Sequence, residues 1–236
     1  MSEPRPGSPR DGRAPAILAI DTATTRVVVA VGRPGGEPLG ISSWPAGHRH
    51  GEQLLPSIGR LLGEANVRRS RLRGIVVGTG PGAFTGLRVG IATAKALAHG
   101  LGIPIAGVAT SEALMAAAAS DGGVPHGHVA LLVPAGPSDR VLCRLGVPPL
   151  LLPAGTEPDL PPADVLVAVD LEGRAPDAAV ALGERARERL GHELLRLGAA
   201  RLRTPDSLAE LVPDYVTLPR GVRAAIDGVE WSSDPR

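Results

Sequence analysis

The chain has 236 residues, of which 43% are hydrophobic and only 2% aromatic, and its formal net charge is +1. This length allows one large domain or two small ones, with a core built from Leu, Val, Ile and Ala. A charge so close to zero gives no broad electrostatic case for binding nucleic acid or membranes.

The cysteine count and the hydropathy pattern bear on the cellular compartment. Cys143 is the only cysteine, which excludes an intramolecular disulfide and a cysteine-based zinc site and fits a reducing cytosol. No apolar run approaches the ~20 residues that span a bilayer. Residues 1–15 lack the apolar middle of a signal peptide. We therefore expect a disordered leader at 1–15, a cytoplasmic location and no contact with membranes.

Residues 16–120 are predicted to form the first domain. Apolar runs at 16–20, 26–32 and 38–44 are separated by short turns, which predicts an antiparallel meander of three strands. Helical and strand patterns then alternate: a helix at 51–66, a strand at 74–78, a helix at 85–100, a strand at 103–108 and a helix at 110–120. Strands separated by helices are usually parallel, so we expect a mixed sheet. A meander followed by two such crossover units is the element order of an actin-like half-domain.

A glycine- and proline-rich stretch at 121–127 marks the expected domain boundary. We predict a smaller, divergent α/β domain at 128–225 and a tail at 226–236. Its expected elements are strands at 128–133, 140–145 and 164–169, a helix at 177–190, and a proline-rich loop at 148–162.

The first candidate site is the polar turn Asp21-Thr22-Ala23-Thr24 at the end of the first strand. Asp21 could hold Mg²⁺, and Thr22 and Thr24 could approach a phosphate. The same residues are also typical of a simple hairpin turn, because Asp and Thr bond to their own backbone there. The spacing alone favours the hairpin turn.

The second candidate site is the glycine-rich segment 78–90, between a strand and a helix. Glycines allow close backbone approach, and a helix start offers free N–H groups to an anion. The spacing fits neither standard nucleotide-binding pattern, however, because Ala83 and Thr85 occupy positions that need glycine and Lys95 lies too far along. Phe84, the only phenylalanine, is expected to anchor this turn in the core.

Four segments in order carry a family resemblance. They are Ile-Leu-Ala-Ile-Asp-Thr-Ala-Thr at 17–24, His-Gly-Glu-Gln-Leu-Leu-Pro at 50–56, Gly-Pro-Gly-Ala-Phe-Thr-Gly-Leu-Arg-Val-Gly at 80–90 and Gly-Ile-Pro-Ile-Ala-Gly-Val-Ala-Thr at 102–110. Over residues 16–119 the chain resembles the TsaB (formerly YeaZ) family. The resemblance implies an actin-like (ASKHA) α/β fold with two lobes, each a mixed sheet flanked by helices.

The resemblance also implies a function and partners. The chain would be a non-catalytic subunit of the complex that forms N6-threonylcarbamoyladenosine at position 37 of tRNA. It would form a heterodimer with the related catalytic subunit TsaD, the ATPase TsaE would join them, and contact with tRNA would be indirect.

The expected residues at the ligand sites follow from the same resemblance. The catalytic relative carries two metal-binding histidines where Thr110 and Leu114 stand here, and His48 and His50 have no matching ligand, so we expect no metal. No catalytic residue is expected. Weak affinity for ATP or ADP with Mg²⁺ would involve Asp21, Thr22, Thr24, Gly80, Pro81 and Gly82.

The two helices at 51–66 and 85–100 are the expected partner surface, because in the family they pack against the same helices of TsaD. The predicted contact residues are His50, Glu52, Leu54, Leu55, Ile58, Leu61, Leu62, Phe84, Thr85, Arg88, Val89, Ile91 and Ala92. Their apolar faces are also compatible with packing inside the chain. The same helices could instead form a homodimer.

Two further features of the sequence leave alternatives open, one for the function of the chain and one for its contact with tRNA. A stand-alone actin-like ATPase or small-molecule kinase would need a second phosphate loop, for which 170–173 is the only candidate. A basic loop with Arg68, Arg69, Arg71 and Arg73 could touch tRNA phosphates, but the lack of interleaved aromatic residues favours a solvated loop.

Overall fold

The computed structural model describes residues 14–47, 50–216, 222–225 and 228–231. The first sheet has the order β3-β2-β1-β4-β5, with β1–β3 antiparallel and β4 and β5 parallel to β1. Its strands are β1 (Ala16–Asp21), β2 (Arg26–Gly32), β3 (Pro38–Pro45), β4 (Leu72–Gly78) and β5 (Ile105–Val108). The accompanying helices are α1 (His50–Glu64), α2 (Phe84–Leu101) and α3 (Thr110–Gly122), with a short 3-10 turn, η1 (Arg69–Arg71), before β4.

The second sheet has the order β8-β7-β6-β9, with β6 and β9 parallel and the other pairs antiparallel. Its strands are β6 (Val129–Ala135), β7 (Asp139–Arg144), β8 (Val147–Leu152) and β9 (Val165–Ala168), preceded by η2 (His126–His128) and followed by helix α4 (Asp177–Arg201). A separate hairpin pairs β10 (Val222–Ala225) with β11 (Gly228–Trp231). Two mixed sheets flanked by helices confirm the predicted actin-like fold class.

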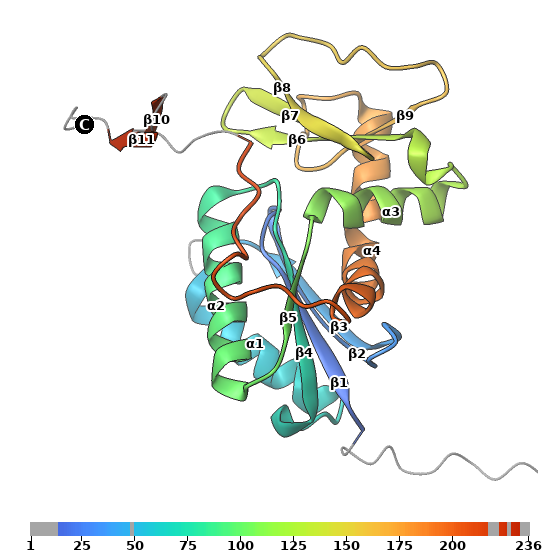
Figure 1. Cartoon of the computed structure of the whole chain (residues 1–236). Helices are drawn as coiled ribbons and strands as arrows, with labels where there is room; N and C mark the ends of the chain where they lie inside the picture. Colours follow the sequence, from blue (N-terminus) through green and yellow to red (C-terminus); the bar gives the residue numbers. More distant parts are fainter. Residues whose placement is uncertain (1–13, 48–49, 217–221, 226–227, 232–236) are drawn as a thin grey trace, which may run out of the picture.

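All six residues of β1 are buried, as expected for a strand covered on both faces, and successive side chains enter different cores. Leu18 and Ile20 belong to one core with α1 and α2, whereas Ile17 and Ala19 belong to a second core with α3 and α4. The second core also includes residues of β6, β7 and β9. Figure 1 shows α3 and α4 between the two sheets, and α1 and α2 on the opposite side of the first sheet.

The prediction ended the last long helix eleven residues too early, at Leu190. Gly191 follows, and glycine is a common helix stop. In the structure α4 continues to Arg201 because its glycines lie against the first sheet. A Cβ on Gly191 would lie 2.9 Å from Ile41 Cγ2, and one on Gly198 would lie 2.3 Å from Val76 Cγ2. These glycines let a helix from the second half of the chain pack closely on the first sheet.

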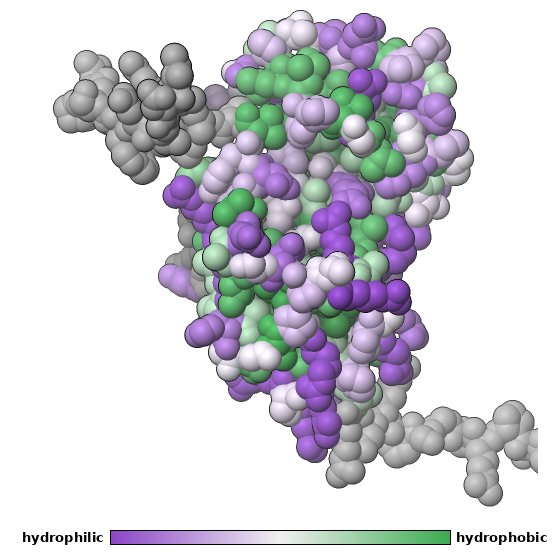
Figure 2. All heavy atoms as spheres, viewed as in Figure 1, coloured by the Kyte–Doolittle hydropathy of each residue, from purple (hydrophilic) through white to green (hydrophobic). Residues whose placement is uncertain are grey.

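Two further predictions need correction. The expected loop at 148–162 contains most of strand β8, which tolerates Pro148 and Pro149 because it lies at the edge of its sheet. Figure 2 shows hydrophobic residues gathered over β7 and β8, in keeping with the exposed Leu150 and Leu151. Residues 228–231 of the expected tail form β11, while 226–227, 232–236 and residues 1–13 of the expected leader lie outside the described residues. No described helix combines the length and apolar character needed to cross a membrane.

Candidate functional site

The Asp21 carboxylate is fully buried at the carboxyl end of β1. Its Oδ1 accepts a hydrogen bond from the Ala23 backbone N–H at 2.9 Å, and its Oδ2 accepts one from the Thr110 hydroxyl at 2.6 Å. The Thr110 Oγ1 in turn accepts from the Gly80 N–H at 3.1 Å. Burial raises the pKa of Asp21 to about 6, against the lowering effect of these hydrogen bonds and with a small further rise from Asp170.

The glycine-rich turn packs directly on this polar turn. The Thr22 hydroxyl donates to the Gly86 carbonyl at 2.7 Å, and the Ala83 N–H donates to the Ala23 carbonyl at 2.7 Å. A Cβ on Gly86 would lie 2.1 Å from the Thr22 carbonyl oxygen, and one on Gly90 would lie 2.1 Å from Thr22 Oγ1. The glycines therefore let α2 approach the turn after β1, rather than leave room for a phosphate.

The residues predicted to bind a nucleotide thus lie close together, but their polar groups form hydrogen bonds within the chain. Asp21, Thr22 and Thr24 are buried, and the Thr24 hydroxyl donates to the Arg26 carbonyl at 2.9 Å. The Gly80 N–H is taken by Thr110. Pro81, Gly82 and Thr24 also line the open space described next.

A cleft of about 740 Å³ lies between the first lobe (β1–β5 with α1 and α2) and the second lobe (β6–β9). Most of its lining residues are apolar, including Ala83, Val133 and Val169. Its acidic lining residues are Asp170 and Asp214, and no Lys or Arg is among the described residues that line it. A phosphate group would find carboxylates here instead of cations.

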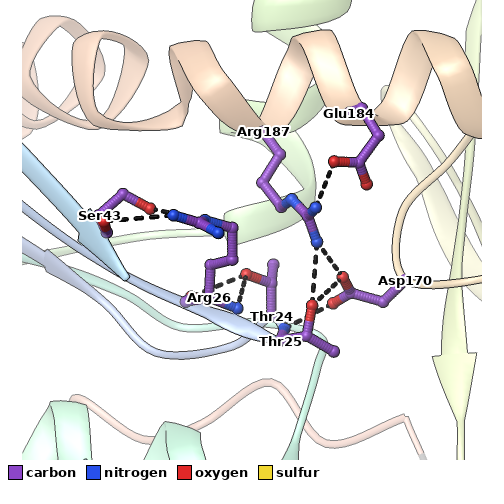
Figure 3. A network of polar contacts seen from close by, with 7 residues as sticks. All are labelled: Thr24, Thr25, Arg26, Ser43, Asp170, Glu184 and Arg187. Atoms are coloured by element: carbon purple, nitrogen blue, oxygen red, sulfur yellow. Dashed lines mark hydrogen bonds and ion pairs between the residues drawn. The ribbon is translucent and has the colours of Figure 1, made fainter. Parts of the chain in front are cut away.

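A polar clamp joins the two lobes beside this cleft (Figure 3). Asp170, which follows β9, accepts hydrogen bonds from the Thr25 N–H at 2.7 Å and from the Thr25 hydroxyl at 2.5 Å. Arg187 extends from α4 toward these residues, and its Nη1 lies 2.6 Å from Asp170 Oδ1 and 2.9 Å from Thr25 Oγ1. The Nη2 of Arg187 pairs with Glu184. The side chains of Arg187 and Asp170 are only 12% and 5% exposed. Asp170 therefore holds the lobes together instead of facing a nucleotide.

The segment before residue 217 crosses the start of α2. The Asp214 carboxylate accepts from the Thr79 hydroxyl at 2.5 Å, and the Asp214 N–H donates to the Thr79 carbonyl at 2.8 Å. The ring of Tyr215 lies 5.1 Å from that of Phe84, and Arg88 donates to the Tyr215 hydroxyl at 3.0 Å while its guanidinium lies 3.9 Å over the Phe84 ring. The prediction that Phe84 anchors the turn in the core is wrong: its ring is half-buried and packs on Tyr215 instead. Nothing in the sequence pattern around either residue indicates this contact.

The expected partner residues on α1 and α2 divide into two groups. Leu54, Ile58, Leu61, Leu62 and Ile91 are buried in the chain's own core and offer no surface to a partner. This part of the predicted contact set is corrected, because these side chains face the first sheet.

The remaining predicted contacts keep exposed or partly exposed side chains. Those on the outer side are Glu52, Leu55, Thr85, Arg88 and Ala92, with Phe84 and Val89 half-buried; the side chain of His50 lies outside the described part of the structure. Leu55 is 53% exposed. The outer surface of α2 carries Thr85, Arg88, Ala92, Ala96 and His99 at helical spacing.

Thr110 and Leu114 are the positions where the resemblance implies histidines in the catalytic relative. Thr110 and Leu114 are both fully buried, with the Thr110 hydroxyl bonded to Asp21. In the described part of the chain, no cluster of three or more His, Cys, Asp or Glu side chains could hold a metal. His48 lies outside the described residues.

Comparison with known proteins finds sequence similarity to one family model and to several curated relatives. Residues 37–145 match the model of the TsaD family, described as tRNA N6-adenosine threonylcarbamoyltransferase. An uncharacterized protein of Mycobacterium tuberculosis is 40% identical over 103 residues, which are 42% of this chain and 47% of that protein. The tRNA threonylcarbamoyladenosine biosynthesis protein TsaB of Escherichia coli is 36% identical over 94 residues, 40% of each chain.

The alignments span less than half the length of these relatives. The structural likeness extends further. YeaZ from Pseudomonas aeruginosa superposes with a TM-score of 0.67 at 24% identity, over 86% of this chain and all of that one. The sequence matches to TsaB proteins support the resemblance carried by the ordered motifs, and the match to YeaZ shows that the chain has the same fold.

Proposed function

We propose that this protein is a non-catalytic subunit of the complex that forms N6-threonylcarbamoyladenosine at position 37 of tRNA. It pairs with a TsaD-type catalytic subunit and supports its activity, and a TsaE-type ATPase joins the pair. The observation that carries the proposal is the closed site at Asp21, whose carboxylate is fully buried and accepts hydrogen bonds from Ala23 and Thr110. The names of the TsaB relatives supply the reaction.

The outer surface of α1 and α2 is the proposed contact with the catalytic subunit. The two helices lie on the same face of the first sheet, and small or apolar residues stand among their exposed positions. Leu55 and Gly59 on α1 and Ala92 and Ala96 on α2 are exposed. Small residues let a partner helix approach closely, and an exposed leucine gives it apolar area to bury.

The stand-alone ATPase or kinase is the less well supported function. Its second phosphate loop would have to begin at Asp170, which is held by Thr25 and Arg187. The cleft between the lobes also has no cation among its described lining residues to hold a triphosphate. Steady ATP hydrolysis by the isolated chain, lost in Asp21→Ala, would favour the ATPase.

The proposed heterodimer is tested by mixing the chain with the TsaD-type protein of the same organism and measuring mass and affinity in solution. We expect a 1:1 complex, weakened roughly 30-fold by Leu55→Asp, which places a charge in the buried contact. Leu150→Asp is the matched control, because Leu150 on β8 is 55% exposed, close to the 53% of Leu55. No complex, or equal effects of both variants, would contradict the proposed surface. A homodimer of the chain alone that Leu55→Asp dissociates would instead favour self-association through the same helices.

A further inference from the structure

A second cavity, of about 650 Å³, lies within the second lobe and shares no lining residue with the cleft between the lobes. It is bordered by the turn between β6 and β7, by the loop after β8, and by the residues leading into α4. Two arginines, Arg140 on β7 and Arg174 before α4, line it together with Glu157. None of these residues takes part in the proposed heterodimer surface.

Arg140 is held in place by backbone carbonyls. The residue is only 4% exposed, and its Nη1 donates to the Arg174 carbonyl at 3.0 Å while its Nη2 donates to the Thr156 carbonyl. Arg174 is fixed in the same way, with its Nη2 donating to the Asp139 carbonyl at 2.7 Å and its Nη1 to the Gly136 carbonyl at 3.4 Å. Both guanidinium groups are therefore fixed at the border of one cavity before any ligand arrives.

Neighbouring carboxylates neutralise the positive charge of Arg140 and Arg174 only in part. Arg140 pairs with Glu157, whose carboxylate lies 3.8 Å from Arg140 Nη2 on a side chain that is 77% exposed. The Asp139 carboxylate instead accepts from the Ala154 N–H at 3.1 Å and lies 3.4 Å from the Ser138 hydroxyl. Backbone carbonyls carry only partial charge, and a buried cation is costly unless a full opposite charge compensates it. The cavity therefore has a net positive lining.

We propose that this cavity is a binding site for a small oxyanion, the phosphate or carboxylate group of a small molecule. A guanidinium presents parallel N–H donors that match both groups, and fixed donors lose little entropy on binding. The ligand displaces the exposed side chain of Glu157, because the Glu157 carboxylate lies as far as 3.8 Å from Arg140 Nη2 and is held weakly. The site is independent of the heterodimer, so either proposal can fail without the other.

The simplest competing explanation is that the two arginines only tie loops together. The variants Glu157→Gln and Arg174→Gln separate the two explanations. In an anion site, Glu157→Gln removes a competing carboxylate and tightens binding, whereas a purely structural role for the arginines gives no binding to tighten. Arg174→Gln removes one of the two cations and weakens binding. Because Glu157 is exposed, its variant also keeps the test valid if Arg174→Gln fails to fold.

The experiment is calorimetric titration of the full chain with inorganic phosphate and, separately, with acetate, at constant ionic strength set by NaCl. We expect saturable binding of at least one anion, about tenfold weaker in Arg174→Gln and severalfold tighter in Glu157→Gln. The control is Arg68→Gln, which removes an exposed arginine from the distant η1 loop and should leave binding unchanged. The anion that binds tells phosphate from carboxylate recognition. Absence of saturable binding of both anions, or equal binding by all variants, would overturn the proposal.

Discussion

The buried Asp21 carboxyl should make the protein less stable as the pH rises from about 4 to 6. Burial raises its pKa from 3.8 to about 6, so within this window the folded state holds a proton that the unfolded chain has lost. The free energy of unfolding then falls by ~1.4 kcal/mol per pH unit, about 3 kcal/mol across the window, and changes no further above it. Below pH 3.8 both states are protonated, and the stabilisation is fully present.

Urea denaturation of the wild type and of Asp21→Asn at pH 4, 5, 6 and 7 measures this effect. All other carboxyl groups titrate in both proteins and cancel in the difference. The free energy of unfolding of the variant, relative to wild type, should therefore rise by about 3 kcal/mol between pH 4 and pH 7. Asp159→Asn, at an exposed position, is the control and should follow the wild-type profile. Parallel profiles for the wild type and Asp21→Asn would refute the argument that burial keeps Asp21 protonated.

Three further perturbations test the packing around the same site and the partner surface. Asp170→Asn should lower the free energy of unfolding by about 3 kcal/mol, because it removes the buried carboxylate of Asp170 and leaves the mostly buried Arg187 with only the more exposed Glu184; an unchanged urea midpoint would contradict the clamp. Gly90→Ala should destabilise by about 1–3 kcal/mol through contact with Thr22, whereas Gly100→Ala, with open space around its position on α2, should raise the thermal midpoint slightly. Leu55→Asp should leave the free energy of unfolding near wild type while weakening the heterodimer, and a large loss of stability would mean that Leu55 belongs to the core.

The first lobe was predictable because its elements carry local signals. The apolar runs of β1 and β2, the Pro34-Gly35-Gly36 turn and the strand-to-helix glycines each mark an element by themselves. The full length of α4 was not predictable, since Gly191 and Gly198 lower helix propensity and only their packing on the first sheet explains them.

The sequence predicted which residues form the candidate site, but not how these residues bond to one another. The motifs identified Asp21, Thr22 and Gly80 as possible nucleotide-binding residues, and the structure brings them together. That they bond to one another rather than to a ligand depends on Thr110, from a different element. The clamp between Thr25 and Asp170 joins residues 145 positions apart, and no periodicity of either segment signals such a contact. On the helices, the pattern identified the apolar residues but not which of them face the sheet.

Reconstituted modification of tRNA tests the central claim most directly. The TsaD-type and TsaE-type proteins of the same organism would be incubated with unmodified tRNA and a threonylcarbamoyl donor, with and without this chain, and the modified nucleoside quantified by mass spectrometry. The proposed function predicts that threonylcarbamoyladenosine forms when this chain is added to the other two proteins and that the chain alone forms none. Modification by the chain alone, or an equal rate in its absence, would contradict it.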